Sequence, residues 1–235
     1  MSLHPRSLRK RLPFASSITT PSRSRSSPKT SPTAYPILKK YNAPGTFFIC
    51  PGLVNRGAWL WNQESRARLH WMRSGALSEL AESLGRPGSN YLQIVERMKL
   101  LPTRSRIHVE QVIRDATPQW RPTRAQEIAN DLMSWDARKI LNPKLITIGA
   151  HSTNHPILAN CTSEELIHEI VDCGPLIEKH LLKPVDFFCY PNGDFNPLVT
   201  RFVEKSYKAA TITRSKDLKT KLTSAGVPEE KIHAN

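Results

Sequence analysis

The chain has 235 residues, of which 39% are hydrophobic, and a formal net charge of +14 at pH 7. This length suits one domain with a tail and allows a sizeable core. The sequence contains no run of about 18 apolar residues, which is what a membrane helix needs, so no membrane span is expected.

The positive charge is concentrated at the start of the chain. Residues 1–40 contain nine Lys or Arg and no acid, and the first acidic residue is Glu64. The rest of the chain therefore carries an ordinary net charge of +5. A basic tail without interleaved stacking aromatics does not favour a nucleic-acid partner, so none is expected.

The first 33 residues differ in composition from the rest. They are rich in Ser, Pro and Arg, and they contain no apolar run of the length that a secretory signal requires. Residues 1–33 are therefore predicted to be a disordered basic tail, either genuine or an artefact of the gene model. The cytoplasm is the default location.

The first half of the remaining chain is predicted to be mainly helical. Residues 34–41 read as the end of a helix, and Thr46–Cys50 is a short apolar run that suits a buried strand. Residues 58–140 follow as a helical region. Its apolar spacing indicates two amphipathic helices, one with Leu92, Val95 and Met98–Lys99 and one with Val109, Val112 and Ile113.

The second half alternates between strands and helices. Residues 145–148, 185–190 and 209–213 are predicted strands, which implies a parallel α/β sheet or barrel with its sites at the C-terminal strand ends. Thr162 and Glu165 form a capping box, and Asn196-Pro197 starts another helix. The helix after Thr162 should bend at Gly174-Pro175. Its expected buried side comprises Leu166, Ile167, Ile170, Val171, Ile177 and Leu181.

Four cysteines are widely spaced and form no C-x-x-C pair: Cys50, Cys161, Cys173 and Cys189. This pattern does not favour a zinc ribbon or a disulfide framework. We expect reduced, partly buried thiols.

Two histidines stand directly after the strand at residues 145–148, in the stretch His151-Ser152-Thr153-Asn154-His155-Pro156. Histidines four residues apart can bind one metal ion. The H-E-x-x-H helix of zinc proteases is excluded, because Ser152 replaces its Glu and Pro156 indicates a loop. From spacing alone, a pair of ordinary loop histidines is an equally good interpretation.

The flanking segments carry a family resemblance. The stretch 151–156 resembles the H-[ST]-x-x-H-P motif of the polysaccharide deacetylase family, also called the nodulation-protein-B homology domain or carbohydrate esterase family 4. Residues 36–48 are similar to the family's first helix and second strand. Residues 133–136 are similar to the segment that leads into the strand before the histidine motif. Phe187–Asp194 is similar to its third motif. The domain is placed at residues 34–235, with the best match over 34–214.

The resemblance implies a distorted (β/α) barrel that removes N-acetyl groups from a poly- or oligosaccharide such as a chitooligosaccharide. A divalent metal, most often zinc in this family, would be bound by His151, His155 and one aspartate, and a second aspartate would be the catalytic base. A backbone N–H near Tyr190–Asn192 would hold the oxyanion. The implied substrate and oxyanion residues are Tyr190, Pro191, Asn192, Gly193 and Asp194.

The chain departs from the family pattern in its first motif. The T-F-D-D strand, which supplies both aspartates, should lie about ten residues before Ala34, but Ser22–Ser27 contains no acid. The catalytic base and the third ligand are thus absent, metal should be weakly held, and the barrel should be incomplete at its N-terminal strand. Asp194 is a candidate substitute ligand. Cys189 replaces the family's arginine, and His233 does not match the late L-x-H motif.

Two functions follow from this resemblance. The first is a metal-dependent hydrolase of amide C–N bonds in carbohydrate metabolism, whose activity the missing aspartates put in question. The alternative is a non-catalytic relative that binds carbohydrate or a partner and arose from a truncated or frame-shifted gene. The choice between chitin-like, peptidoglycan and exopolysaccharide substrates stays open. The tryptophans at 59, 61, 71 and 120 fit two interpretations equally well. They belong either to a helical insertion that shapes the sugar groove or to a packed core.

Overall fold

The computed structural model describes residues 34–212. The predicted tail at residues 1–33, His233 and the end of the last predicted strand lie outside these described residues. Among the described residues, no helix is long and apolar enough to cross a membrane.

A parallel four-stranded sheet is the centre of the fold. Its strands are β1 (Gly45–Ile49), β2 (Ile146–Ala150), β3 (Phe187–Cys189) and β4 (Ala209–Thr211), in the spatial order β1-β2-β3-β4. The predicted α/β class with a parallel sheet is confirmed, and an open sheet of this kind fits an incomplete (β/α) barrel.

The pairing along the sheet is uneven. All five residues of β1 pair with β2, from Gly45 with Ile146 to Ile49 with Ala150. The strands β2 and β3 pair only at Ala150 with Phe188. Because Ala150 is the last residue of β2, these two strands meet at the C-terminal edge of the sheet and separate toward its N-terminal edge.

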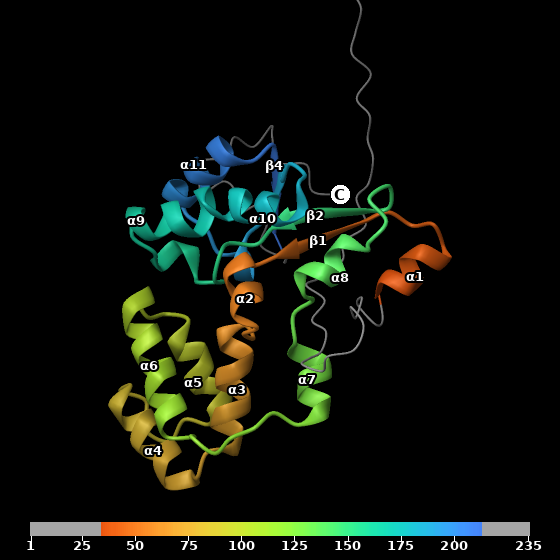
Figure 1. Cartoon of the computed structure of the whole chain (residues 1–235). Coiled ribbons are helices and arrows are strands. Elements are labelled where there is room, and N and C mark those ends of the chain that lie inside the picture. Colours follow the sequence, from red (N-terminus) through yellow and green to blue (C-terminus); the bar gives the residue numbers. More distant parts are fainter. Residues whose placement is uncertain (1–33, 213–235) are drawn as a thin grey trace, which may run out of the picture.

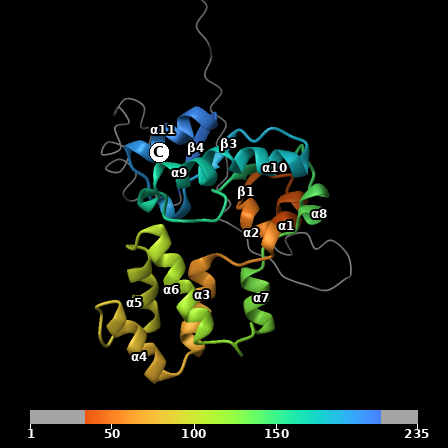
Figure 2. The same cartoon turned by 60° about the vertical axis from the view of Figure 1, so that its left-hand side comes forward.

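Helices surround the sheet and form a second lobe. Helices α3 to α7 lie together on one side of the sheet, and α8 to α11 lie along it (Figures 1 and 2). The α-helices are α1 (Ala34–Lys40), α2 (Pro51–Arg56), α3 (Trp61–Trp71), α4 (Ser74–Ser83), α5 (Tyr91–Met98), α6 (Thr103–Asp115), α7 (Arg124–Asn130), α8 (Trp135–Lys139), α9 (Ser163–Leu166), α10 (Cys173–Leu181) and α11 (Pro197–Ser206). Short 3-10 turns span Leu158–Asn160 and Pro191–Gly193.

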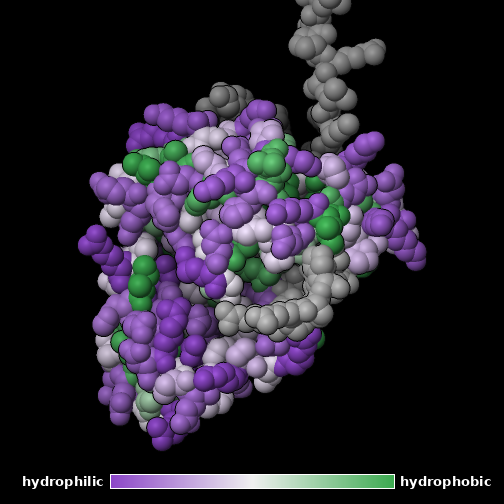
Figure 3. Space-filling model, viewed as in Figure 1, coloured by the Kyte–Doolittle hydropathy of each residue, from purple (hydrophilic) through white to green (hydrophobic). Residues whose placement is uncertain are grey.

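Each lobe has its own core. The sheet lobe packs Phe188 and Val199 with Ile170 of the segment before α10. The helical lobe packs Leu69, Ile94 and other apolar residues of α3 to α6. The exterior seen in Figure 3 is mostly hydrophilic, with small separate hydrophobic patches. All four cysteines are free, and three of them are buried, as the sequence predicts.

Local capping signals begin two of the predicted helices. Thr162 and Glu165 form the expected capping box, with each side chain bonded to the other residue's backbone N–H. Asn196 caps α11 by accepting from the Val199 N–H, and Pro197 is the first helical residue. Both predictions are confirmed.

The predicted buried face of the helix after Thr162 is partly wrong. Ile167 and Val171 are exposed to 48% and 39%. The reason is a π-helical segment at Ile167–Val171, whose wider turn rotates these side chains away from a regular 3.6-residue stripe. The helix is then interrupted at Asp172, and α10 starts afresh at Cys173, close to the predicted bend at Gly174-Pro175.

Two further apolar residues are more exposed than predicted. The face of α5 consists of Ile94, Val95 and Met98, while Leu92 is exposed in the first turn. In α6, Val109 and Ile113 are buried and Val112 lies at the exposed margin of the apolar face. A stripe of two or three buried apolar positions suffices to dock each helix, so the neighbouring apolar residue stays outside it.

Candidate functional site

His151 lies at the point where three strands end together. It directly follows β2, and its backbone N–H donates to the Ile49 carbonyl at 2.9 Å, which extends the β1–β2 ladder. Its ring Nδ1 lies 2.7 Å from the carbonyl oxygen of Cys189, the last residue of β3. Because a carbonyl only accepts, Nδ1 carries the proton, and Nε2 keeps a lone pair that can bind a metal.

The loop after His151 turns back so that His155 faces it. Ser152 and His155 both have left-handed backbone conformations, with φ of 59° and 60°, and the Ser152 hydroxyl accepts from the His155 N–H at 2.9 Å. The two imidazole centroids lie 4.9 Å apart. The structure therefore brings the predicted pair together at the C-terminal edge of the sheet.

Glu169, a residue of the π-helical segment, fixes the middle of this loop. Its carboxylate accepts from the Asn154 backbone N–H and from the Asn154 side-chain amide, both at 2.7 Å. Its backbone carbonyl accepts from the Thr153 N–H at 3.1 Å. Hydrogen bonds to a buried carboxylate are stronger than those between neutral groups, so this residue holds the loop between the two histidines.

Gly52, the second residue of α2, lies against the other side of the loop. Its N–H donates to the Thr153 carbonyl at 3.0 Å. A Cβ at this position would lie 2.5 Å from Oδ1 of Asn154 and 2.8 Å from the Thr153 carbonyl oxygen. Only glycine allows the loop to approach α2 this closely.

Trp61 connects the loop to the helical lobe. Its indole N–H donates to the His155 carbonyl at 2.9 Å, and the Arg106 guanidinium stacks over its ring at 4.7 Å from the centroid. Arg106 in turn forms a buried ion pair with Glu110. The backbone of His155 is thereby held by a residue almost one hundred positions earlier in the chain.

Both imidazoles are neutral near pH 7. Burial lowers the pKa of His151 to about 4. Burial, followed by repulsion from His151, lowers the pKa of His155 well below its usual value. Neutral imidazole is the form that binds metals, so this environment favours the ligand state. The Nδ1 atom of His155 is buried and has no hydrogen-bond partner among residues 34–212.

These residues fit a metal ion only in part. Two buried, neutral imidazoles and one unsatisfied ring nitrogen are suitable donors. However, no group of three His, Cys, Asp or Glu side chains that could hold a metal occurs within residues 34–212. Zinc sites in proteins use three or four protein ligands, so the described donor set is incomplete, and Asp194 does not complete it. No step of a reaction is therefore assigned to a bound metal.

The segment after β3 contains the residues that the resemblance assigned to substrate and oxyanion binding. The Tyr190 side chain is buried in the sheet core against Phe188 and Phe195, and its backbone N–H donates to Thr211 at 3.0 Å. Tyr190 is thus a core residue whose N–H is already used, and it cannot bind an oxyanion in this conformation.

The turn at Pro191–Gly193 leaves one polar group without a partner. The N–H groups of Gly193 and Asp194 donate to Tyr190 and Pro191, at 3.0 and 3.2 Å. Asn192 has a left-handed backbone with φ of 56°, and its side-chain Nδ2 is buried without a hydrogen-bond partner in the described part of the chain. Asn192 is therefore the residue of the predicted set that best keeps a donor for a ligand.

The tryptophans of the helical region are mostly structural. Trp61 and Trp120 are buried, Trp59 packs edge-on against Trp120 at 5.8 Å, and Trp71 is half-exposed on α3. Core packing accounts for the first three. Sequence reasoning missed the contacts of Trp61, Gly52 and Glu169 with the histidine loop, since no local pattern marks them.

Comparison with known proteins finds a family model that matches part of this chain. Residues 112–211 match the family model described as polysaccharide deacetylase. No curated protein matches the chain.

Solved structures resemble the chain weakly. The deacetylase PplD of Streptococcus pyogenes, solved with acetate, is 17% identical with a TM-score of 0.42; the match covers 74% of this chain and 46% of that protein. IcaB from Ammonifex degensii is 12% identical, with a TM-score of 0.40 and coverage of 83% and 66%. The CE4 family pseudoenzyme BA3943 from Bacillus anthracis is 16% identical, with a TM-score of 0.37 and coverage of 77% and 37%. The chain spans less than half the length of the first of these proteins.

Proposed function

We propose that the chain acts on the N-acetyl groups of a poly- or oligosaccharide, and that its divalent metal binds at His151 and His155. The match of residues 112–211 to the polysaccharide deacetylase family model supports this proposal. The observation that carries this proposal is the convergence of the two buried imidazoles, 4.9 Å apart, at the C-terminal edge of a parallel sheet. Sites of α/β folds lie at this edge.

The surroundings of the histidines support a ligand role. A bond from Nδ1 of His151 to the Cys189 carbonyl orients the ring, and both imidazoles are neutral at pH 7 because they are buried. Metal-binding histidines commonly have such a second hydrogen bond, which fixes the tautomer. The loop between them is held by contacts from three separate segments of the chain, namely α2, α3 and the π-helical turn.

The reaction class in question is hydrolysis of an amide bond. Water adds to the N-acetyl carbonyl, the C–N bond breaks, and acetate and a free amine on the sugar are released. Such a reaction needs a base to take the proton from the water. Neither His151 nor His155 is suited to that role while it binds a metal.

A second candidate is a non-catalytic saccharide-binding relative. The donor set favours it, since two imidazoles without a third ligand in the described part of the chain would hold zinc weakly. Asn192 Nδ2 would then serve binding, by donating to an acetamido oxygen, rather than catalysis.

We expect the two candidates to be separated by one assay of the full chain. Purified protein is incubated with zinc and an N-acetylated chitooligosaccharide, and acetate release and oligosaccharide binding are both measured. Acetate that appears with zinc and is lost in a His151→Asn/His155→Asn variant supports the enzyme. Binding without acetate supports the second candidate. The absence of both binding and acetate release, with this substrate and with peptidoglycan and exopolysaccharide fragments, would contradict both candidates.

A further inference from the structure

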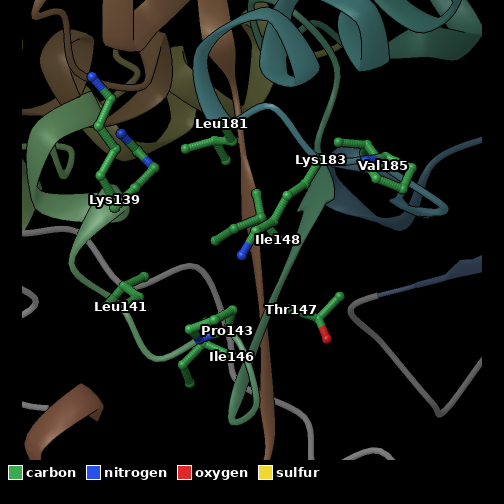
Figure 4. A pocket seen from close by; sticks show the side chains of 11 residues that line it. Lys139, Leu141, Pro143, Ile146, Thr147, Ile148, Leu181, Lys183 and Val185 are labelled. Atoms are coloured by element: carbon green, nitrogen blue, oxygen red, sulfur yellow. The ribbon is translucent and has the colours of Figure 1, made fainter.

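A cavity of about 350 Å³ lies between β2 and β3, toward the N-terminal edge of the sheet. It is present because β2 pairs with β3 only at its last residue, Ala150, so the strands are separated where the cavity opens. It is lined by Ile146 and Ile148 of β2 and by the segment 183–185 that leads into β3 (Figure 4). His151 follows the opposite end of β2, so this cavity is separate from the histidine pair.

The walls combine apolar and cationic side chains. Ile146, Ile148, Leu181 and Val185 provide aliphatic surface around the space. Three cations also line it: Arg138, Lys139 and Lys183. None of the described residues that line the cavity is acidic. In Figure 4 the Lys183 side chain extends toward Ile148.

Arg138 is the unusual member of this set. It is only 5% exposed. Its guanidinium donates to the Met133 carbonyl and stacks over Trp135 at 5.2 Å, but its Nε has no hydrogen-bond partner within residues 34–212. No carboxylate of residues 34–212 forms an ion pair with it. Of the two exposed lysines, Lys139 pairs with Asp136 at 3.3 Å, and Lys183 has no ion-pair partner in the same part of the chain.

A buried cation without a counter-charge is unfavourable. Arginine and lysine are almost never fully buried unless they are paired. Burial lowers the pKa of Arg138 to about 9, since removal from water disfavours the charged guanidinium. An anion at the cavity wall would compensate this charge, and the aliphatic side chains would cover an apolar chain attached to it.

We propose that the cavity between β2 and β3 binds a small amphipathic carboxylate, with its head group at Arg138 and Lys183 and its aliphatic chain along Ile146, Ile148, Leu181 and Val185. A volume of about 350 Å³ is at the small end of ligand pockets and suits a chain of roughly eight carbons. This proposal is independent of the function proposed for the histidine pair.

Calorimetric titration of the full chain with octanoate tests the proposal. We expect saturable binding of one octanoate per chain. Acetate, which lacks the chain, and 1-octanol, which lacks the charge, should each bind at least about 10-fold more weakly, because both halves of the site contribute. The Arg138→Met variant should bind octanoate at least about 10-fold more weakly, and Lys183→Met a few-fold more weakly. Lys205→Met, which removes an exposed charge on α11 away from the cavity, should bind like the wild type.

Two measurements keep the test decisive. Circular dichroism shows whether Arg138→Met is folded; if it is not, Lys183→Met carries the charge test, since Lys183 is exposed. Methyl NMR resonances of Ile148, Leu181 and Val185 should shift on octanoate binding in the wild type. Octanol binding as tightly as octanoate, unchanged binding in a folded Lys183→Met variant, or no shift of these methyl groups would each overturn the proposal.

Discussion

Replacing Gly52 by alanine is expected to destabilise the chain by about 3 kcal/mol and to disrupt the histidine loop. The added Cβ would lie 2.8 Å from the Thr153 carbonyl oxygen and 2.5 Å from Asn154 Oδ1. A backbone oxygen cannot rotate away as a flexible side chain can, so α2 and the loop must separate. That separation breaks the hydrogen bond from Gly52 to Thr153 and shifts both histidines.

A matched control lies in the helical lobe. Gly75 is in α4, and a Cβ there would have no heavy atom within 4 Å. Gly75→Ala should therefore be neutral or stabilise by about 0.5–1 kcal/mol, since alanine favours helices. Urea denaturation of both variants gives the two free energies of unfolding. Equal effects of the two substitutions would show that the close approach at Gly52 is not a constraint.

Replacing Glu169 by alanine is expected to cost about 3 kcal/mol. The substitution removes the acceptor for two hydrogen bonds of 2.7 Å. The Asn154 backbone N–H has then lost its partner, and the side-chain amide keeps only its 3.3 Å contact with Nε2 of His168. Unsatisfied buried polar groups cost about 1–3 kcal/mol each. The loop between the histidines should also become mobile, which we expect to weaken zinc binding about 10-fold or more, as for other outer-shell residues of metal sites.

The conservative variant separates charge from packing. Glu169→Gln keeps the shape and one acceptor oxygen but replaces the other by an amide donor, so about half of the destabilisation should remain. Glu79→Ala, an exposed residue of α4, should change stability by less than about 0.5 kcal/mol. A Glu169→Ala variant as stable as Glu79→Ala would contradict the assigned role of the carboxylate.

Local signals in the sequence predicted the elements that end in recognisable caps. Thr162 with Glu165, and Asn196 with Pro197, begin helices where expected because the groups that stabilise these ends are neighbours in the chain. The four strands were also predictable from short apolar runs. The π-helical segment at Ile167–Val171 was not, since its sequence satisfies the regular helical period equally well.

The sequence predicts some residues of the candidate site and not others. The position of His151 and His155 at a strand end follows from the sequence, but their supporting residues do not. Gly52, Trp61 and Glu169 lie 15 to about one hundred residues from their partners in the loop, and long-range contacts of this kind leave no local pattern. Tyr190 shows that a residue of a recognised motif can also be part of the core.

The central claim is that His151 and His155 form the metal-binding part of this chain, and calorimetric titration of the metal-free full chain with zinc tests it most directly. If the proposal is right, we expect one zinc ion per chain, weakly bound because the described ligand set is incomplete, and no binding at that site in a folded His151→Asn/His155→Asn variant. Equal zinc binding by the wild type and the double variant, or no zinc binding by the wild type, would contradict the claim.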